Sequence, residues 1–96
     1  MNDNLCIGRV CKAKAGRGKN RYFIIYGIVN EEYVLLTDGA TRKLERPKLK
    51  KKKHLLCRPY VATEIAEAIE KGAPLLDAEI RNALDRITAI EISKEK

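Results

Sequence analysis

GRVCKAKAGRGKNRYFIIYGIVNEEYVLLTDG, residues 8–39, contains the apolar runs that decide the fold of this chain. Residues 22–29 (YFIIYGIV) are almost continuously β-branched or aromatic, and residues 33–37 (YVLLT) have a similar composition, which is typical of strands. The shorter segment CIGRVCK, residues 6–12, is expected to form a strand before them. Three such segments close together in sequence predict a small antiparallel sheet.

The segments between these strands carry turn signals. Asn30 to Glu32 is expected to form a turn, and Asp38-Gly39 is the strongest hairpin signal in the chain. The hairpin predicts that residues 41–44 (TRKL) return as a further strand. Short strands joined by tight turns within about 55 residues suggest a small barrel of the SH3 type.

Alternation within residues 22–29 indicates which side chains face the core. It places Phe23, Ile25 and Val29 on the buried face. Gly27 interrupts the row and would let the strand bend, as a tightly closed barrel requires.

The segment that follows Pro47 is strongly basic. PKLKKKKHLLCRP could be a disordered tract, but we favour a partly ordered arm that its apolar residues anchor to the barrel. These residues are Leu49, Leu55, Leu56 and Cys57. Pro59 is expected to mark the end of this part of the chain.

After Pro59 the apolar spacing becomes helical. Thr63 is expected to cap a short helix, with Gly72 as its C-terminal stop and Pro74 beyond. The apolar residues of this helix are Ile65, Ala66 and Ile69.

A second helix is expected to begin at a cap, Asp77. Its apolar stripe consists of Ile80, Leu84 and Ile87, widened by Ala83 and Ile90. Residues Glu91 to Lys96 are expected to fray. Because so short a helix pair cannot bury its apolar face alone, it must pack on the barrel or on another chain, and we favour the barrel.

We therefore expect a mainly β fold in which an SH3-like barrel is followed by a C-terminal pair of short α-helices. The barrel with its basic arm occupies residues 1–58, and the acidic helical segment occupies residues 59–96 and packs on the barrel.

Charge is distributed unevenly between these two parts. From Met1 to Arg58 there are 15 Lys/Arg and 5 Asp/Glu, whereas from Pro59 to Lys96 there are 5 and 8. The net charge of +7 is therefore concentrated in the first part. Such a basic folded region indicates a partner with dense negative charge, and nucleic acid is the leading candidate.

The loop after the first strand combines cations with glycines. Glycine lets the main chain approach a phosphate or base closely, and two strands would hold this loop at one end of the barrel. A flexible, solvated loop is the alternative. The residues concerned are Lys12, Lys14, Gly16, Arg17, Gly18, Lys19 and Arg21.

Residues 8–39, as quoted above, resemble a KOW motif, which is a strand, a Gly/Lys-rich loop and a second apolar strand. The continuation RKLERPKLKKKKHL, residues 42–55, resembles bacterial KOW-domain RNA-binding proteins related to a large-subunit ribosomal protein family of archaea and eukaryotes. The resemblance covers residues 6–58 and implies an SH3-like barrel that binds RNA, ribosomal RNA in particular. Asn20 stands where the motif usually has glycine, and asparagine tolerates φ > 0 better than most residues.

Further cations would extend the RNA contact from the loop. Phosphate contacts fix position, and structured RNA is recognised largely through shape and backbone. Tyr22 or Tyr26 could stack on an unpaired base, although either could equally belong to the core. The additional RNA-binding candidates are Arg42, Lys43, Arg46, Lys48, Lys50, Lys51, Lys52, Lys53 and His54.

Other classes of function fit the sequence less well. His54 is the only histidine and no nucleophile motif accompanies it, so we expect neither an enzyme nor a small-molecule substrate. A protein-interaction module that docks onto ribosomal proteins or a transcription or translation factor is the main alternative, and non-specific DNA binding is a weaker one. No apolar stretch approaches membrane-spanning length and no signal peptide is recognisable, so a cytoplasmic protein without membrane association is expected.

A zinc site was weighed for Cys6, Cys11, His54 and Cys57, whose C-x4-C and H-x2-C spacings supply four potential ligands. Cys6 and Cys11 would point to opposite faces if both lay on one strand. Free thiols, with no metal or cofactor, are therefore expected.

Overall fold

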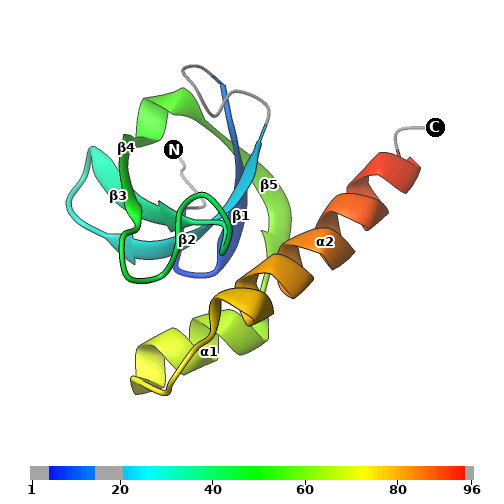
Figure 1. Ribbon diagram of the computed structural model, residues 1–96. Coiled ribbons are helices and arrows are strands. Elements are labelled where there is room, and N and C mark those ends of the chain that lie inside the picture. The colour runs from blue at the N-terminus through cyan, green and yellow to red at the C-terminus, as the bar shows by residue number, and fades with distance from the viewer. Residues whose placement is uncertain (1–4, 15–20, 95–96) are drawn as a thin grey trace.

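The computed structural model describes residues 5–14 and 21–94 as five strands and two α-helices (Figure 1). The strands form one antiparallel sheet of order β4-β3-β2-β1-β5, which curls into a barrel-like shape. The expected fold class, a small β-barrel followed by two helices, is confirmed. The elements are β1 (Arg9–Ala13), β2 (Tyr22–Ile28), β3 (Tyr33–Thr37), β4 (Lys48–Lys51), a 3-10 helix η1 (Lys52–His54), β5 (Leu55–Val61), α1 (Thr63–Lys71) and α2 (Asp77–Lys94).

Strand β2 is buried on both faces, which explains its nearly continuous apolar sequence. Phe23 and Ile25 point into the barrel, as predicted, while Ile24 between them is fully buried on the other face. The prediction for Val29 is wrong: this residue lies beyond the end of β2 and is 51% exposed. The expected bend is present as a break in register between Ile25 and Gly27.

Two separate cores result from this double burial. The barrel interior contains Cys11, Ala13, Phe23, Ile25, Val34, Leu36 and Leu55. The second core lies between the sheet and the helices and contains Val10, Ile24, Ala62, Ile65, Ile80, Ala83, Leu84 and Ile87. The helices therefore pack on the barrel through the stripe of α2 that the sequence indicated.

The first strand starts later than predicted. Residues Cys6 to Gly8 form a turn in which the Arg9 N–H donates to the Cys6 carbonyl at 3.0 Å, and β1 begins only at Arg9. Cys6 and Cys11 are therefore not on one strand, and the argument that they point to opposite faces of a strand does not apply.

The prediction that residues 41–44 form the returning strand is also wrong. They belong to a loop, and the strand paired with β3 is β4, which lies within the lysine tract. Asp38 organises this loop: its carboxylate accepts hydrogen bonds from the main-chain N–H groups of Ala40 and Arg42 and from the Thr41 hydroxyl. The basic segment is thus neither a disordered tract nor an arm: it contains β4 and most of β5, the two edge strands of the sheet, joined by η1.

Gly39 lets this loop lie against α2. Its φ is +75°, and a side chain here would collide with the carbonyl oxygen of Asp77. Asp77 is the first residue of α2, and its carboxylate accepts a hydrogen bond from the Leu44 N–H at 2.8 Å. The residue expected to precede and cap the helix is thus its first residue, and its carboxylate fixes the loop.

Helix α1 stops at Gly72, which has φ +69°, as predicted; its N-cap is Ala62 rather than Thr63. Strand β5 continues through Pro59 to Val61, past the boundary expected at residue 58. As β5 is an edge strand, a proline is tolerated within it.

Helix α2 continues to Lys94, so the expected fraying is wrong for residues 91–94; Glu95 and Lys96 lie outside the described residues. Glu91 is only 3% exposed; it accepts a hydrogen bond from the Tyr22 hydroxyl at 2.9 Å and pairs with Arg58 at 2.8 Å. Ile90, expected to widen the buried stripe, is instead 47% exposed.

Candidate nucleic-acid interface

The lysine tract becomes the edge strand β4 because its main chain pairs with β3. Lys48 lies opposite Leu36 and Lys50 opposite Val34, and directly opposite residues share a face, so these lysines leave the strand on the side of the barrel interior. Lys51 lies opposite Tyr33 on the outer face. An edge strand tolerates such charges, and they oppose pairing with another chain.

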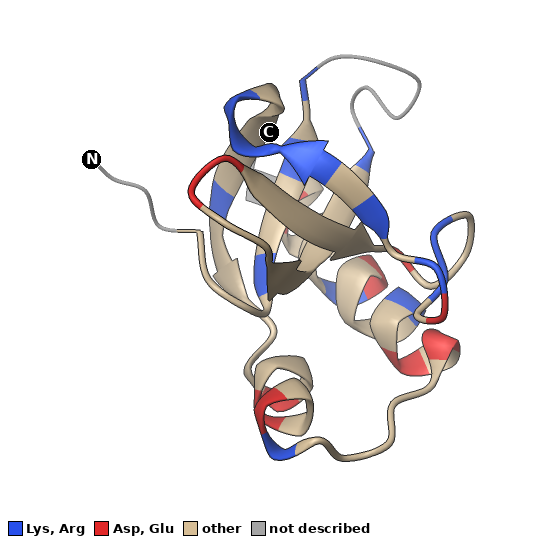
Figure 2. Ribbon diagram, turned by 90° about the vertical axis from the view of Figure 1, so that its left-hand side faces the viewer, with Lys and Arg blue, Asp and Glu red and all other residues tan. Residues whose placement is uncertain are grey.

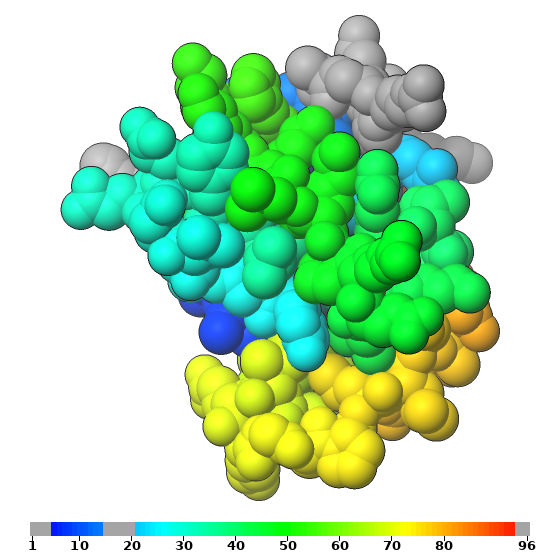
Figure 3. Space-filling model, turned by 60° about the vertical axis from the view of Figure 1, so that its left-hand side comes forward, coloured from blue at the N-terminus to red at the C-terminus, as the bar shows by residue number. Residues whose placement is uncertain are grey.

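Basic side chains consequently follow β4 along its length. Figure 2 shows Lys and Arg along this strand, from the loop before it to η1 after it, while most acidic residues lie on the helices. In Figure 3 the surface of β4 (green) lies at the centre of the visible face, next to the β2–β3 hairpin (cyan). The basic residues Lys48 and Lys50 to Lys53 therefore lie on folded elements at one edge of the barrel, and we call them the lysine rim.

The 3-10 helix η1 turns the chain from β4 into β5 and brings Lys14 to the same place. The Lys14 N–H donates to the carbonyl of His54 at 2.9 Å, and the Lys52 N–H donates to that of Glu32 at 2.8 Å. Lys53 is exposed and His54 is half-buried. The end of β1 and the lysine tract, far apart in sequence, therefore meet at one end of the barrel.

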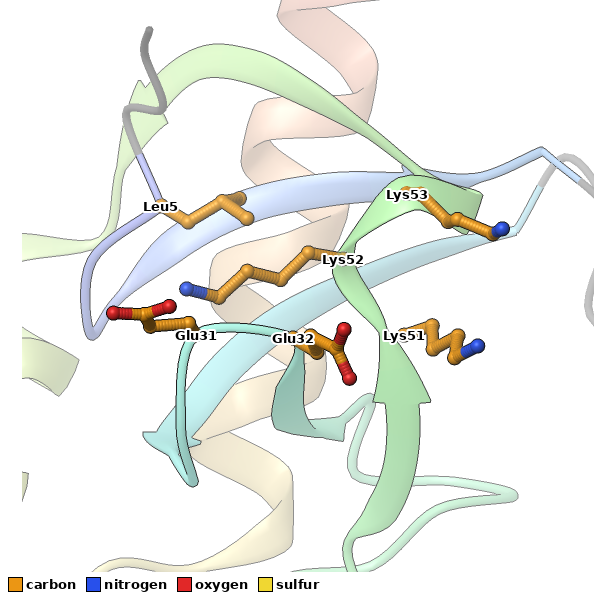
Figure 4. Close-up of a pocket in the computed structure, with 6 residues that line it drawn as sticks. All are labelled: Leu5, Glu31, Glu32, Lys51, Lys52 and Lys53. Atoms are coloured by element: carbon orange, nitrogen blue, oxygen red, sulfur yellow. The ribbon is translucent and has the colours of Figure 1, made fainter.

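A cavity of about 420 Å³ lies beside η1 (Figure 4). Lys52 extends across it toward Glu31, whereas Lys51 and Lys53 point away from that carboxylate. An anion in the cavity would face both Glu31 and Glu32. Lys51 and Lys53 therefore carry their charges on the outer side, away from Glu31.

The loop between β3 and β4, which leads into the lysine rim, carries further cations. Lys43 and Arg46 are exposed there, while Arg42 is half-buried and its main chain binds Asp38 and the Thr37 hydroxyl. Arg42 therefore stabilises the loop through its main chain, in addition to carrying a positive charge.

Asp38 is held ionised in this loop. Burial opposes ionisation, but the hydrogen bonds from the loop and the positive charge of Arg21, 3.8 Å away, outweigh it and lower the pKa of Asp38. Arg21 itself is 51% exposed.

The central residues of the predicted Gly/Lys loop, Gly16, Arg17, Gly18 and Lys19, lie outside the described residues. Their neighbours Lys14 and Arg21 are exposed. Lys12 differs: it is half-buried on β1, with its ammonium 5.5 Å from the centre of the Tyr22 ring.

Of the two tyrosines considered for base stacking, Tyr22 is committed to the fold. Its hydroxyl donates to the buried Glu91, and its ring packs against the core between the sheet and the helices. Tyr26 is half-buried within the β2 bulge. Sequence reasoning missed Tyr33, whose ring has the Lys51 ammonium 5.9 Å from its centre. Only the pairing of β3 with β4 reveals that contact.

Two basic residues outside the lysine rim have structural partners. Arg58 pairs with Glu91, and Arg9 donates to the Arg58 carbonyl at 3.0 Å. Their partners are 33 and 49 residues away, so no local sequence signal could have identified these contacts.

The cysteines form a buried contact between β1 and β5. Cys11 lies opposite Cys57, and burial together with the neighbouring thiols raises the pKa of Cys11 to about 12. Within residues 5–14 and 21–94 no three His, Cys, Asp or Glu residues are grouped as a metal site would require.

No helix in the described part of the chain is long and apolar enough to cross a bilayer. None of the models of known protein families matches this sequence.

Proposed function

We propose that this chain is a non-catalytic RNA-binding protein that associates with ribosomal RNA or the ribosome in the cytoplasm. The observation that carries the proposal is the rim of lysines on β4 and η1, which a folded edge presents between the Arg42–Arg46 loop and Lys14. The resemblance of residues 8–39 to a KOW motif supports RNA as the polyanion.

The rim suits the phosphate backbone rather than a single small anion. Its cations are spread along one strand and the turn that follows it, so successive phosphates can be neutralised while the barrel keeps its shape. Backbone recognition of this kind depends on the shape of the RNA and on released counterions.

A protein-interaction module is the second candidate. The stripe that a partner helix would have used, Ile80, Leu84 and Ile87, is buried against the sheet, which counts against this candidate. Ile90 and Ile92 on α2 favour a protein-interaction module, because these apolar side chains are 47% and 53% exposed.

A salt titration of binding to a structured ribosomal RNA fragment tests the proposal. If five or six phosphates are neutralised, log K should fall with log salt with a slope of about −4 to −5. A slope near zero would contradict the electrostatic mechanism. Crosslinking in cells, followed by sequencing of the attached RNA, would then identify the ligand, and recovery of DNA or protein alone would exclude ribosomal RNA.

A further inference from the structure

The outer face of β3 and β4 carries a shelf of aromatic and apolar side chains beside the lysine rim. Leu35 lies opposite Leu49, and Tyr33 opposite Lys51, so these four side chains share one face. Leu49 is 54% exposed, and Tyr33 and Leu35 are half-buried. We call Tyr33, Leu35 and Leu49 the outer shelf.

Gly27 lies beside the outer shelf and adds no side chain to it. It lies opposite Leu35 on β2, at the bulge. An added Cβ would stand 3.5 Å from Leu35 Cδ1, an ordinary contact, so packing does not require glycine at this position. The missing side chain leaves the flank of Leu35 accessible.

The two helices lie away from the outer shelf. The core that they form with the sheet uses Val10 and Ile24, on the face nearer β1 and β5. Figures 1 and 3 show α1 and α2 beside and below the β2–β3–β4 surface rather than over it. Within the described residues, this face of the sheet is thus available to a ligand.

We propose that the outer shelf binds unpaired RNA bases, with Tyr33 as the stacking platform, while the lysine rim holds the adjoining phosphates. The inference rests on the proposed function and specifies its ligand as RNA with a bulge or single-stranded stretch. Lys51 joins the two surfaces, because it belongs to the rim and lies over the Tyr33 ring.

Charge selects RNA over a protein as the occupant. A partner on this face would meet the Lys51 ammonium beside an apolar surface only as wide as a few side chains, whereas Lys48 and Lys50 leave the strand on the opposite face. A nucleotide satisfies both requirements, because its base offers a neutral π face and its phosphate offers an anion.

The test compares two RNA hairpins, one with an unpaired purine bulge and the same hairpin with the bulge deleted. The parent protein should prefer the bulged hairpin by about tenfold, the contribution of one stacked base. Tyr33→Leu, which keeps an apolar side chain but removes the ring, should bind both hairpins equally and retain the parent's affinity for the uninterrupted one.

Two further variants keep the test interpretable. Ile90→Ser, on α2, replaces an apolar residue about as exposed as Leu49 and should keep the tenfold preference. Gly27→Val adds a side chain beside Leu35 on the outer shelf and should abolish the preference for the bulged hairpin. This variant replaces Tyr33→Leu in the test if circular dichroism shows Tyr33→Leu to be unfolded.

A parent protein that binds both hairpins equally, in a salt-dependent manner, would overturn this inference and leave the proposed function intact. A folded Tyr33→Leu or Gly27→Val protein that keeps the preference would also overturn it. Failure of the parent to bind either hairpin or the ribosomal fragment at low salt would instead contradict the proposed function.

Discussion

The helix side and the rim side of this barrel use their cations in different ways. On the helix side, Arg58 pairs with the buried Glu91 across 2.8 Å. On the rim, Lys48, Lys52 and Lys53 form no ion pair with any carboxylate that the structure describes. One set of charges therefore contributes to folding, and the other is available to a ligand.

This comparison teaches that net charge alone does not locate a binding surface. Arg9 and Arg58 belong to the basic first part of the chain, yet both bind protein groups. The segment that looked least ordered in the sequence, the lysine tract, is the one built into the sheet.

Removing charge from the rim should give the largest effect on binding. Lys50, Lys51, Lys52 and Lys53, all replaced by Gln, should lose about a hundredfold in RNA affinity at physiological salt and reduce the salt slope by about 3 to 4. The melting temperature should change little: Lys53 is exposed and the other three are half-buried, and Gln keeps part of the aliphatic stem and a polar head at each position. Filter binding and thermal melts measure the two effects.

Lys71→Gln, on the last turn of α1, is the matched control and should leave the salt slope unchanged. A loss of slope of about 0.9 in this variant, the share of one lysine, would show that binding is governed by total charge. An unfolded four-lysine variant would show that the tract was misinterpreted as a solvated rim.

Breaking the Arg58–Glu91 pair on the helix side should lower stability and leave RNA binding unchanged, the reverse of the effect of the lysine substitutions. Glu91→Ala leaves the half-buried Arg58 and the Tyr22 hydroxyl without this partner and should cost about 2 kcal/mol of unfolding free energy. RNA affinity of the folded protein should be unchanged. Urea unfolding measures the first and the filter assay the second.

An exposed ion pair supplies the control for this variant. Glu64 and Arg86 also form a salt bridge, but their side chains are 56% and 64% exposed. Glu64→Ala should therefore cost less than about 0.5 kcal/mol. If both variants cost the same, burial of Glu91 is not what makes its pair important.

How far the sequence predicts this molecule depends on whether each signal is local. The strands at residues 22–28 and 33–37, the bend at Gly27 and the stop at Gly72 follow from side-chain type within a few positions, and all are found. Strand β4 could not be predicted, because an edge strand needs only main-chain pairing and carries lysines on both faces.

The same distinction applies to the candidate site. The exposed cations Lys14, Lys43 and Lys53 were identifiable from composition. The partnership of Lys51 with Tyr33 was not, because it depends on the register of β3 against β4. Glu91 was misjudged as part of a frayed end because its partners belong to strands far away in the sequence.

The loop around Asp38 lies where the helix side and the rim side of the barrel meet. It leads from β3 toward the rim, and it contacts α2 because Arg81 donates a hydrogen bond to the Gly39 carbonyl at 2.7 Å. The pKa of Asp38 is lowered in the folded protein, so its contribution to stability is present above the pKa of the unfolded chain and is lost as pH falls through the folded value.

Asp38→Asn should therefore cost about 1 kcal/mol near neutral pH, because it weakens the acceptor of three hydrogen bonds, and progressively less in acid. Urea unfolding of parent and variant at neutral pH and below the ordinary carboxyl range measures the difference. A cost independent of pH would mean that the loop depends on the shape of Asp38 rather than on its charge. RNA binding of Asp38→Asn at neutral pH should fall only if the loop carries Lys43 and Arg46 away from the rim.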